Sequence, residues 1–442
     1  MSEVVTRFPP SPTGLLQAGN VRTAIFNYLF ARKHGGKFIV RIEDTDKVRS
    51  KKEYEDNIVA TLEWLGLNFD EFYRQSDRLA RHKEVTASLI ERDLAYVSKE
   101  EPTEPGQRPE VIRFRNPNTT VSFLDVIRGE ISFDTTELGD FIIARSFDEP
   151  LYHLGVVVDD FDAGVTHIIR GEDHISNTPR QILLQHAIGQ REQPIYAHLP
   201  LLLGTDRSKL SKRKGARAIA WYRDEGYVPE AVINYLALLG WHPHDEQEIF
   251  SLDQLIESFE LARVQKGGAV FDETKLAWFN HEHLKRFSQA EYSARLEEYM
   301  VNAGVVVPQY FSKISPLLQE RYQTLKEASD AIAGNEYDFM NEAVVLSREL
   351  LVSGAKADAP AVKMHLQKLA ELLESLADED FSAEVVKGAV FEYATAQGRA
   401  CVLWPMRTAL SGKEKSPDPF TLAGLLGKKV TQERIVAAAS IL

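Results

Sequence analysis

A short basic loop near the middle of the chain has the composition of a phosphate-binding element. The stretch DRSKLSKRKG, residues 206–215, has no apolar periodicity and crowds basic side chains between serines and a glycine, among them Lys209, Lys212, Arg213 and Lys214. Ammonium groups on such a loop can reach the oxygens of a triphosphate and act as point charges where negative charge grows in a transition state. By itself the loop is equally compatible with a solvated basic surface.

A proline- and glycine-rich segment near the N-terminus offers a second ligand-binding element. Residues 4–8 are predicted to form a short strand, the prolines of FPPSPTG then exclude regular structure, and apolar residues recur at helical spacing from Asn20. Ligands of open α/β sheets bind where such loops leave the carboxyl ends of strands. Gly14 and Gly19 permit close approach to the backbone, and a helix N-terminus favours an anion. Alone, such a turn is weak evidence of a site.

Three acidic residues follow the next predicted strand. The stretch RIEDTD, residues 41–46, places Glu43, Asp44 and Asp46 at the end of a β-rich run. Carboxylates there could hold an ammonium group or a metal ion, or they could simply begin a turn, where Asp and Thr are ordinary residues.

The elements that must position these residues form an α/β pattern. The first predicted helix ends at Gly35, and residues 37–42 are β-rich, which gives a strand–turn–helix–strand unit of the length of a parallel crossover. Ser50 and Glu53 have the spacing of a capping box and predict a second helix that ends at Gly66.

A second α/β stretch follows later in the chain. Residues 165–170 predict a buried strand, and Thr178 with the proline after it predicts the start of a helix that Gly189 stops. Residues 78–155, between the two stretches, contain hairpin-like runs and are interpreted as an insertion. The last third of the chain is predicted to be helical, because it is rich in Ala, Leu, Glu and Lys and has no strand signals.

Composition places the chain among ordinary globular proteins. Its 442 residues are too many for one hydrophobic core, and 44% of them are hydrophobic and 26% charged. No apolar run approaches the roughly 20 residues that span a bilayer, and the first residues lack a signal-peptide pattern, so a cytoplasmic protein is expected. The single cysteine, Cys401, excludes an internal disulfide and a cysteine-based zinc site.

The net charge of −13 argues against a chain that coats nucleic acid, but the basic residues are concentrated. Residues 1–52 contain ten Lys or Arg against four Asp or Glu, and residues 206–223 contain seven against one. An acidic chain with a few basic segments suits a phosphate-rich ligand that contacts the protein only at those segments.

Several motifs, taken in their order along the chain, resemble one known family. The stretches TRFPPSPTGLLQAGN, RIEDTD, YHLGVVVDD, IIRGEDH and KLSKRKG resemble those of the bacterial-type glutamyl-tRNA synthetases, a class I family. Further on, RYQTLKEASD and WPMRTALSGKEKSPDPF look like parts of that family's helical anticodon-binding domain. The resemblance implies an α/β fold with the Rossmann-like parallel sheet of class I synthetases and an inserted acceptor-binding domain, followed by an all-α C-terminal anticodon-binding domain.

The resemblance also implies a division of the chain. Residues 1–77 and 156–215 would form the two halves of the Rossmann catalytic domain, separated by an acceptor-stem-binding insertion at 78–155. A stem-contact connecting domain at 216–290 and the helical anticodon-binding domain at 291–442 would follow.

Two signatures of the family imply where ATP binds. The first spans Pro10 to Asn20 at the head of a helix, and the second is KLSKR, in which Lys212 would reach the phosphates as the adenylate forms. The residues expected to bind ATP are Pro10, Ser11, Gly14, Gln17, Gly19, Asn20, Lys209, Leu210, Ser211, Lys212 and Arg213. Of these, Lys209, Lys212 and Gln17 are the expected catalytic residues.

The resemblance likewise implies a glutamate pocket. Arg7 matches the arginine that pairs with the side-chain carboxylate of the substrate, and its planar fork suits bidentate pairing. Glu43 matches the acid that holds the α-amino group. Ser11, Tyr152 and Arg170 match further residues of the same pocket.

The implied function is ligation of L-glutamate to the 3′ end of tRNA(Glu) through glutamyl-AMP, with ATP and substrate-bound Mg²⁺. No metal site of the protein's own and no zinc are expected, because AYVSKEE, residues 95–101, stands where some relatives carry cysteines. The expected partners are L-glutamate and tRNA, with no membrane, and the expected state is a monomer.

The chain departs from the family's pattern at Gln17, because the first signature normally begins with histidine there. Glutamine donates through its amide but carries no positive charge. The residue is either a tolerated variant, which the other intact motifs favour, or the mark of a catalytically impaired, tRNA-binding pseudo-synthetase. Residues 363–387 contain no arginine of the kind that discriminating members use to reject tRNA(Gln), so charging of tRNA(Gln) is also left open.

Overall fold

The computed structural model describes residues 3–100, 109–210, 217–341 and 343–442. The chain divides into two compact units, Met1–Leu284 and Lys285–Leu442. Three of the residues expected to bind ATP, Ser211, Lys212 and Arg213, lie outside the described ranges.

The first unit is built on parallel strands in the order expected of a Rossmann-like sheet. Strand β1 (Val5–Phe8) pairs with β2 (Lys37–Ile42), which pairs with β3 (Glu71–Arg74). On the other side of β1 lie β10 (His167–Gly171) and its parallel partner β11 (Ile195–Leu199). The two groups are joined because Thr166 bonds to the backbone of Val5 through both its own N–H and its hydroxyl. The resulting order β3-β2-β1-β10-β11 confirms the predicted parallel sheet.

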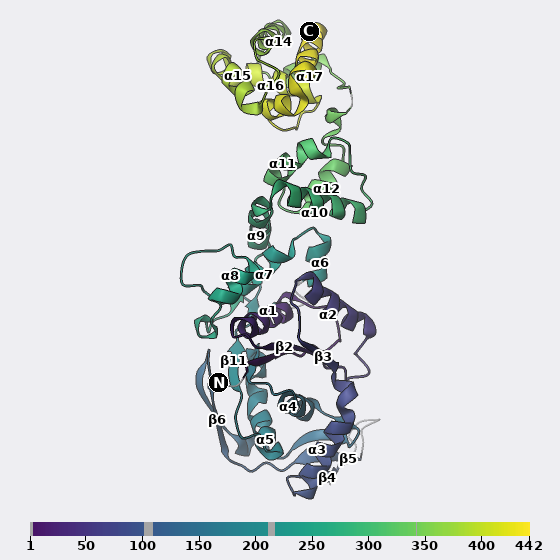
Figure 1. Cartoon of the computed structure of the whole chain (residues 1–442), viewed down its shortest axis with the longest axis vertical. Coiled ribbons are helices and arrows are strands. Elements are labelled where there is room, and N and C mark those ends of the chain that lie inside the picture. Colours follow the sequence, from purple (N-terminus) through teal and green to yellow (C-terminus); the bar gives the residue numbers. More distant parts are fainter. Residues whose placement is uncertain (1–2, 101–108, 211–216, 342) are drawn as a thin grey trace. The chain divides into compact units, whose positions relative to one another are not determined.

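Alternation along these strands supplies a hydrophobic core on each face of the sheet. Val40 and Ile169 belong to one buried cluster with the helices α1 (Ala18–Lys33) and α2 (Lys52–Trp64). Their neighbours Ile39 and Ile168 belong to a second cluster with α4 (Tyr152–Asp162) and α5 (Thr178–Ile188). Successive side chains of a strand point to opposite faces, so both faces need a cover of helices. Figure 1 shows α1 and α2 on one side of the strands and α4 and α5 on the other.

Two predicted helix starts are wrong in detail. Helix α1 begins at Ala18, two residues before the predicted start. Ser50 does not cap α2: the cap position is Lys51, the Ser50 hydroxyl is buried without a hydrogen-bond partner among the described residues, and the Ser50 N–H closes a turn onto the carbonyl of Asp46. The tight turn after RIEDTD therefore moves the helix start one residue along the chain.

The segment between the two halves of the sheet contributes to two different sheets. After α3 (Leu79–Glu91) it forms an antiparallel sheet with the strand order β4-β5-β8-β9. These strands are β4 (Ala95–Lys99), β5 (Glu110–Phe114), β8 (Phe141–Ser146) and β9 (Glu149–Pro150). The hairpin of β6 (Thr120–Asp125) and β7 (Gly129–Asp134) instead joins the parallel sheet, because Asp125 pairs with Tyr196 of β11.

The rest of the described part of the first unit contains two short strands and four α-helices, the last of which continues past Leu284. Strands β12 (Leu202–Leu203) and β13 (Ala269–Val270) pair in parallel. The helices are α6 (Ile219–Asp224), α7 (Pro229–Leu238), α8 (Leu252–Ser258) and α9 (Glu273–Arg286). Helices α7 and α8 contribute to the same core as α1, which fixes the helix whose N-terminus faces the candidate site.

The second unit is helical, as predicted, and residues 285–341 and 343–442 contain no strand. Its helices are α10 (Gln289–Asn302), α11 (Phe311–Arg321), α12 (Leu325–Ala333), α13 (Arg348–Ser353), α14 (Ala359–Glu374), α15 (Ala383–Gln397), α16 (Arg399–Ser411) and α17 (Pro419–Ile441). Helix α17 is kinked at Gly427, whose φ of 76° only glycine adopts readily. In the described ranges of both units, no helix is both long enough and apolar enough to cross a membrane.

Candidate active site

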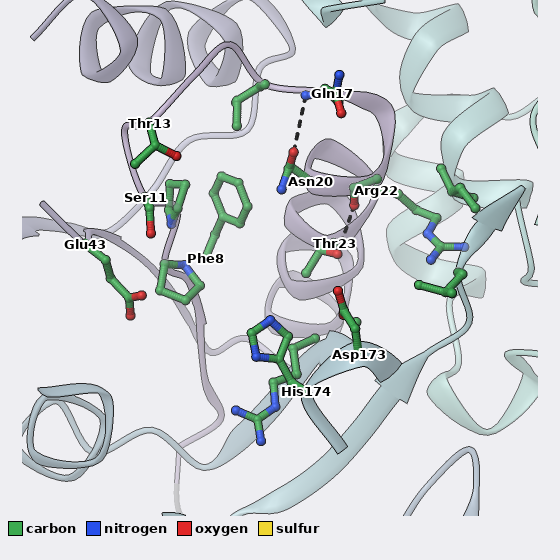
Figure 2. A pocket seen from close by; sticks show the side chains of 18 of the residues that line it. Phe8, Ser11, Thr13, Gln17, Asn20, Arg22, Thr23, Glu43, Asp173 and His174 are labelled. Carbon is green, nitrogen blue, oxygen red and sulfur yellow. Dashed lines mark hydrogen bonds between the residues drawn. The ribbon is translucent and has the colours of Figure 1, made fainter. Parts of the chain in front are cut away.

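A cavity of about 460 Å³ lies at the carboxyl ends of β1, β2 and β10. The predicted site residues that line it are Arg7, Pro10, Ser11, Gly14, Gln17, Gly19, Asn20, Glu43, Tyr152, Arg170, Lys209 and Leu210. Figure 2 shows Glu43 and Ser11 on one side of the cavity and Asn20 and Thr23 of α1 on the other. The fold thus brings together residues that are up to about 200 positions apart in the chain.

The base of the cavity is a buried cluster of arginines and carboxylates. Arg7 Nε donates to Asp160 Oδ2 at 3.2 Å, and Arg41 Nη1 donates to Asp160 Oδ1 at 2.6 Å. Burial alone would raise the pKa of Asp160, but the two guanidinium groups hold it below its ordinary value. Arg7 Nη1 is also buried, and it has no hydrogen-bond partner among the described residues. An unpartnered cationic donor beside a cavity suits a ligand carboxylate.

Glu43 is the acidic residue of RIEDTD that lines this cavity. Its Oε1 accepts from Arg41 Nη2 at 3.1 Å, and burial raises its pKa while Arg41 opposes that shift. Asp44 accepts from the backbone N–H and the hydroxyl of Ser76, and Asp46 accepts from two backbone N–H groups in a turn. Of the three acids in this stretch, Glu43 lines this cavity, whereas Asp44 and Asp46 make structural bonds within the chain.

Arg170, at the end of β10, is a buried cation held by neutral acceptors. Its Nη1 donates to Gln181 Oε1 at 2.7 Å, its Nη2 to Thr178 Oγ1 at 2.9 Å and its Nε to His198 Nε2 at 3.2 Å. In the described part of the chain no carboxylate forms an ion pair with it. Burial lowers its pKa from the usual value for arginine. Helix α5 begins at Thr178, as predicted, but the cap position is Asn177, and the Thr178 hydroxyl instead accepts from Arg170.

The first turn of α1 forms the opposite wall. Gln17 is the N-cap residue, and its backbone N–H lies 3.4 Å from the Oδ1 of Asn20 that accepts its hydrogen bond (Figure 2). Apart from the adjacent residues and the helix's own backbone, no described atom lies within 4 Å of the position that a Cβ on Gly19 would take. The cavity thus leaves room for a ligand to approach the helix N-terminus, where the partial positive charge favours phosphate.

Several lining residues are not among the predicted site residues, and two of them, Asp173 and His174, belong to the IIRGEDH stretch. Asp173 Oδ2 lies 3.4 Å from Lys209 Nζ, which ties the start of the KLSKR loop to the site. His174 Nδ1 pairs with the hydroxyl of Tyr152 at 3.0 Å, and burial together with Arg170 lowers the pKa of His174 to about 4. The signal that could have found them is their position directly after a strand that ends at the cavity.

Comparison with known proteins agrees with the fold. The family described as "tRNA synthetases class I (E and Q), catalytic domain" matches residues 3–104 and 102–278, and the "Anticodon binding domain" matches residues 282–439. The chain is 39% identical to a glutamate–tRNA ligase of Aquifex aeolicus over 99% of its own length and 98% of the relative's. It is 38% identical to glutamate–tRNA ligase 1 of Alkalilimnicola ehrlichii, with 99% and 98% covered.

A solved structure of a related protein has the same fold. The crystal structure of a glutamate tRNA ligase from Elizabethkingia meningosepticum, in complex with its amino acid, superimposes with a TM-score of 0.83 at 32% identity and covers 100% of both chains. The parallel sheet, the cavity at its carboxyl edge and these matches define the catalytic domain of a class I aminoacyl-tRNA synthetase.

Within that class, the chain belongs to the glutamate–tRNA ligase family and is an aminoacyl-tRNA ligase with an anticodon-binding domain. The expected fold, a class I catalytic domain followed by a helical anticodon-binding domain, is confirmed. The names of these relatives give no support to the alternative of a pseudo-synthetase, nor to charging of tRNA(Gln).

Proposed function

We propose that this chain joins L-glutamate to the 3′ end of tRNA(Glu) by way of glutamyl-AMP. The observation that supports this assignment is the pair of buried arginines at one cavity: Arg7 with its unpartnered Nη1, and Arg170 with no carboxylate partner in the described residues. Two cations suit the side-chain carboxylate of glutamate, and an amide would leave uncompensated the charge of Arg170, which pairs with no carboxylate among the described residues. Glu43 would hold the α-amino group, and Ser11 and Tyr152 would complete the pocket.

ATP would lie against the first turn of α1, beside Gly19, with Pro10 to Asn20 around it. Lys209 would act on the phosphates from the other wall, together with Lys212 in the part of the loop outside the described residues. Among the residues that the structure describes, no group of three or more His, Cys, Asp or Glu is placed to hold a metal ion. Mg²⁺ would bind mainly through phosphate oxygens, where it would spread negative charge. The absence of zinc stays a prediction from the AYVSKEE stretch.

The chemistry needs positioning and charge stabilisation and no covalent enzyme intermediate. The α-carboxylate oxygen of glutamate forms a bond to the α-phosphorus of ATP while the bond to pyrophosphate breaks. A hydroxyl of the terminal ribose of tRNA then attacks the activated carbonyl carbon, AMP leaves, and the hydroxyl proton is lost. Gln17 and Lys209 would stabilise the charge on the phosphate oxygens during the first step.

A second cavity of about 1010 Å³ shares Ser11, Glu43 and Tyr152 with the first. Arg145 and Gln75 are among its other lining residues. We propose that this cavity admits the acceptor end of tRNA, because its shared wall would bring the terminal ribose to the activated glutamate. The five-part division of the chain, with an acceptor-binding insertion at 78–155, belongs to the same proposal.

The test is aminoacylation of separate tRNA(Glu) and tRNA(Gln) transcripts with ATP and Mg²⁺. Charging of tRNA(Glu) with glutamate, and not with glutamine, is the expected result. Failure to charge tRNA(Glu), in a protein that still binds it, would contradict the proposal and favour the pseudo-synthetase. Charging of tRNA(Gln) and the monomeric state stay predictions, which the same assay and light scattering of the protein would decide.

A further inference from the structure

Arg170 is held by a chain of buried hydrogen bonds that begins at Asp125 on another strand, β6. Asp125, the last residue of β6, accepts from His198 Nδ1 through Oδ2 at 2.7 Å. His198 Nε2 in turn faces Arg170 Nε at 3.2 Å. Asp125 and His198 are 1% and 0% exposed, so both side chains are shielded from solvent.

The direction of each bond follows from what the groups can do. A guanidinium nitrogen only donates, so His198 Nε2 must offer a lone pair to Arg170. The proton of neutral His198 is therefore on Nδ1, where it donates to Asp125. Asp125 also accepts from three backbone N–H groups, those of Ile127, Arg128 and His198. Burial would raise the pKa of Asp125, but these bonds and His198 hold it below its ordinary value, so Asp125 stays an acceptor.

Placing a neutral imidazole between Asp125 and Arg170 has an electrostatic consequence. A carboxylate in direct contact would orient Arg170 but would also compensate its charge. His198 gives the same orientation and leaves the charge available at the cavity. Thr178 and Gln181 on α5 act alike, because both are neutral acceptors.

We propose that His198 is a positioning residue, held by Asp125 in its Nδ1–H form, which aims the uncompensated charge of Arg170 at the substrate carboxylate. This inference rests on the proposed function, in which Arg170 binds that carboxylate. It also gives the β6–β7 hairpin a role in the amino-acid pocket, because Asp125 comes from that hairpin and not from the strands that flank the cavity.

The arrangement works only while His198 is neutral. A proton on Nε2 would set two donors and two positive charges against each other at 3.2 Å. Burial lowers the pKa of His198, and Arg170 and Arg128 act in the same direction, while Asp125 opposes them. The other neighbours are neutral near pH 7: Thr178, and Tyr196, whose ring stacks on His198 and whose pKa burial raises to about 12.

Two substitutions separate positioning from simple packing. Leucine at 198 cannot accept from Arg170, whereas the side-chain oxygen of glutamine can. We expect His198→Leu to raise the KM for glutamate by about tenfold or more, with the KM for ATP changed less than about twofold, and His198→Gln to stay within about threefold of the parent. The control is His167→Leu on neighbouring β10, because His167 packs against Phe30 and does not line the cavity. Equal changes in the ATP and glutamate constants, or no change in either, would overturn the inference.

Histidine nitrogen NMR of the full chain provides a second readout that does not depend on turnover. In ¹⁵N-histidine-labelled protein, the signal that is lost in His198→Gln should be that of a neutral ring protonated at Nδ1. A ring protonated at Nε2 or at both nitrogens at pH 7 would contradict the inference. If the unmodified enzyme fails to charge tRNA(Glu), the proposed function fails, and the NMR result still decides the state of His198.

The pH dependence offers a third comparison. Below the pKa of His198, the KM of the parent enzyme for glutamate should rise. His198→Gln should not show this rise, because glutamine does not titrate. Glu43 and His174 also face the cavity and titrate in acid, and both are present in the two proteins. Positive charge on His198 lowers the pKa of His174, so the difference between the two profiles reports the charge on His198, directly and through His174. If the two KM profiles superimpose down to the lowest pH at which both proteins stay folded, the inference is contradicted.

Discussion

Asp160 Oδ2 lies 3.2 Å from Arg7 Nε, and the two side chains are 4% and 2% exposed. The same carboxylate bonds to Arg41, which bonds to Glu43. One aspartate on α4 therefore orients the groups assigned to both ends of the substrate: Arg7 for the side-chain carboxylate and, through Arg41, Glu43 for the ammonium group. The neighbouring Asp159 accepts from Gln75 and pairs with His82, which anchors this turn of α4 to the segment before it.

The first prediction concerns Arg7. In Arg7→Lys the positive charge remains, but the planar fork that can hold Asp160 and a ligand carboxylate at the same time is lost. We expect kcat/KM for glutamate to fall by about 100-fold, with a change of less than about threefold in the KM for ATP. Steady-state aminoacylation at varied glutamate and varied ATP measures both. An unchanged glutamate constant would contradict the assignment of Arg7.

The second prediction concerns Asp160. Asp160→Asn leaves Arg7 and Arg41 buried with one negative charge fewer, and breaking a buried ion pair costs about 3–5 kcal/mol. We expect a clear fall in the thermal midpoint of the first unit, measured by calorimetry. The matched control is Asp162→Asn on the same helix, where the carboxylate pairs with Arg78 and Arg81 near the surface and contributes about 1 kcal/mol or less. Equal effects of the two substitutions would show that the buried carboxylate of Asp160 stabilises the fold no more than that of Asp162 near the surface.

The contribution of Asp160 also has a predicted pH dependence. The pKa of Asp160 is lowered in the folded protein, so the fold favours its ionised form. The resulting stabilisation is fully present above the ordinary value of 3.8 and is lost as the pH falls through the lowered value in the folded protein. The difference in thermal midpoint between the parent and Asp160→Asn should be the same at pH 7 and pH 6 and should shrink below pH 4. A difference that grows in acid would have the wrong sign.

The fourth prediction concerns Gln17 at the N-cap of α1. If the amide supplies the hydrogen bond that the family's histidine normally supplies, Gln17→His should change kcat by less than about threefold. Gln17→Ala removes the donor and should lower kcat by about 10²- to 10³-fold, as for other donors to developing charge. Glutamate-dependent pyrophosphate exchange in the presence of tRNA measures the activation step. A large gain in Gln17→His would mark the glutamine as a defect.

Local residue patterns in the sequence were enough to predict several strands and helices and the general place of the site. The β-rich run 37–42 is strand β2 with the predicted bounds, and Gly189 ends α5 in the left-handed conformation with φ 93°. These predictions succeed because strand alternation, glycine stops and helical spacing depend on neighbours within a few residues. The predicted cap at Ser50 is wrong because the Ser50 backbone N–H closes a turn onto the carbonyl of Asp46.

What the sequence by itself determined is which chemical groups are present: the two signatures, the arginines and Glu43, in the order typical of class I glutamyl-tRNA synthetases. Only the tertiary structure decided their partners. Asp160 reaches Arg7 across 153 residues of sequence, and Asp125 reaches His198 across 73. No local pattern marks such pairs, because a hydrogen bond depends on distances of about 3 Å that only the packed sheet and its helices establish.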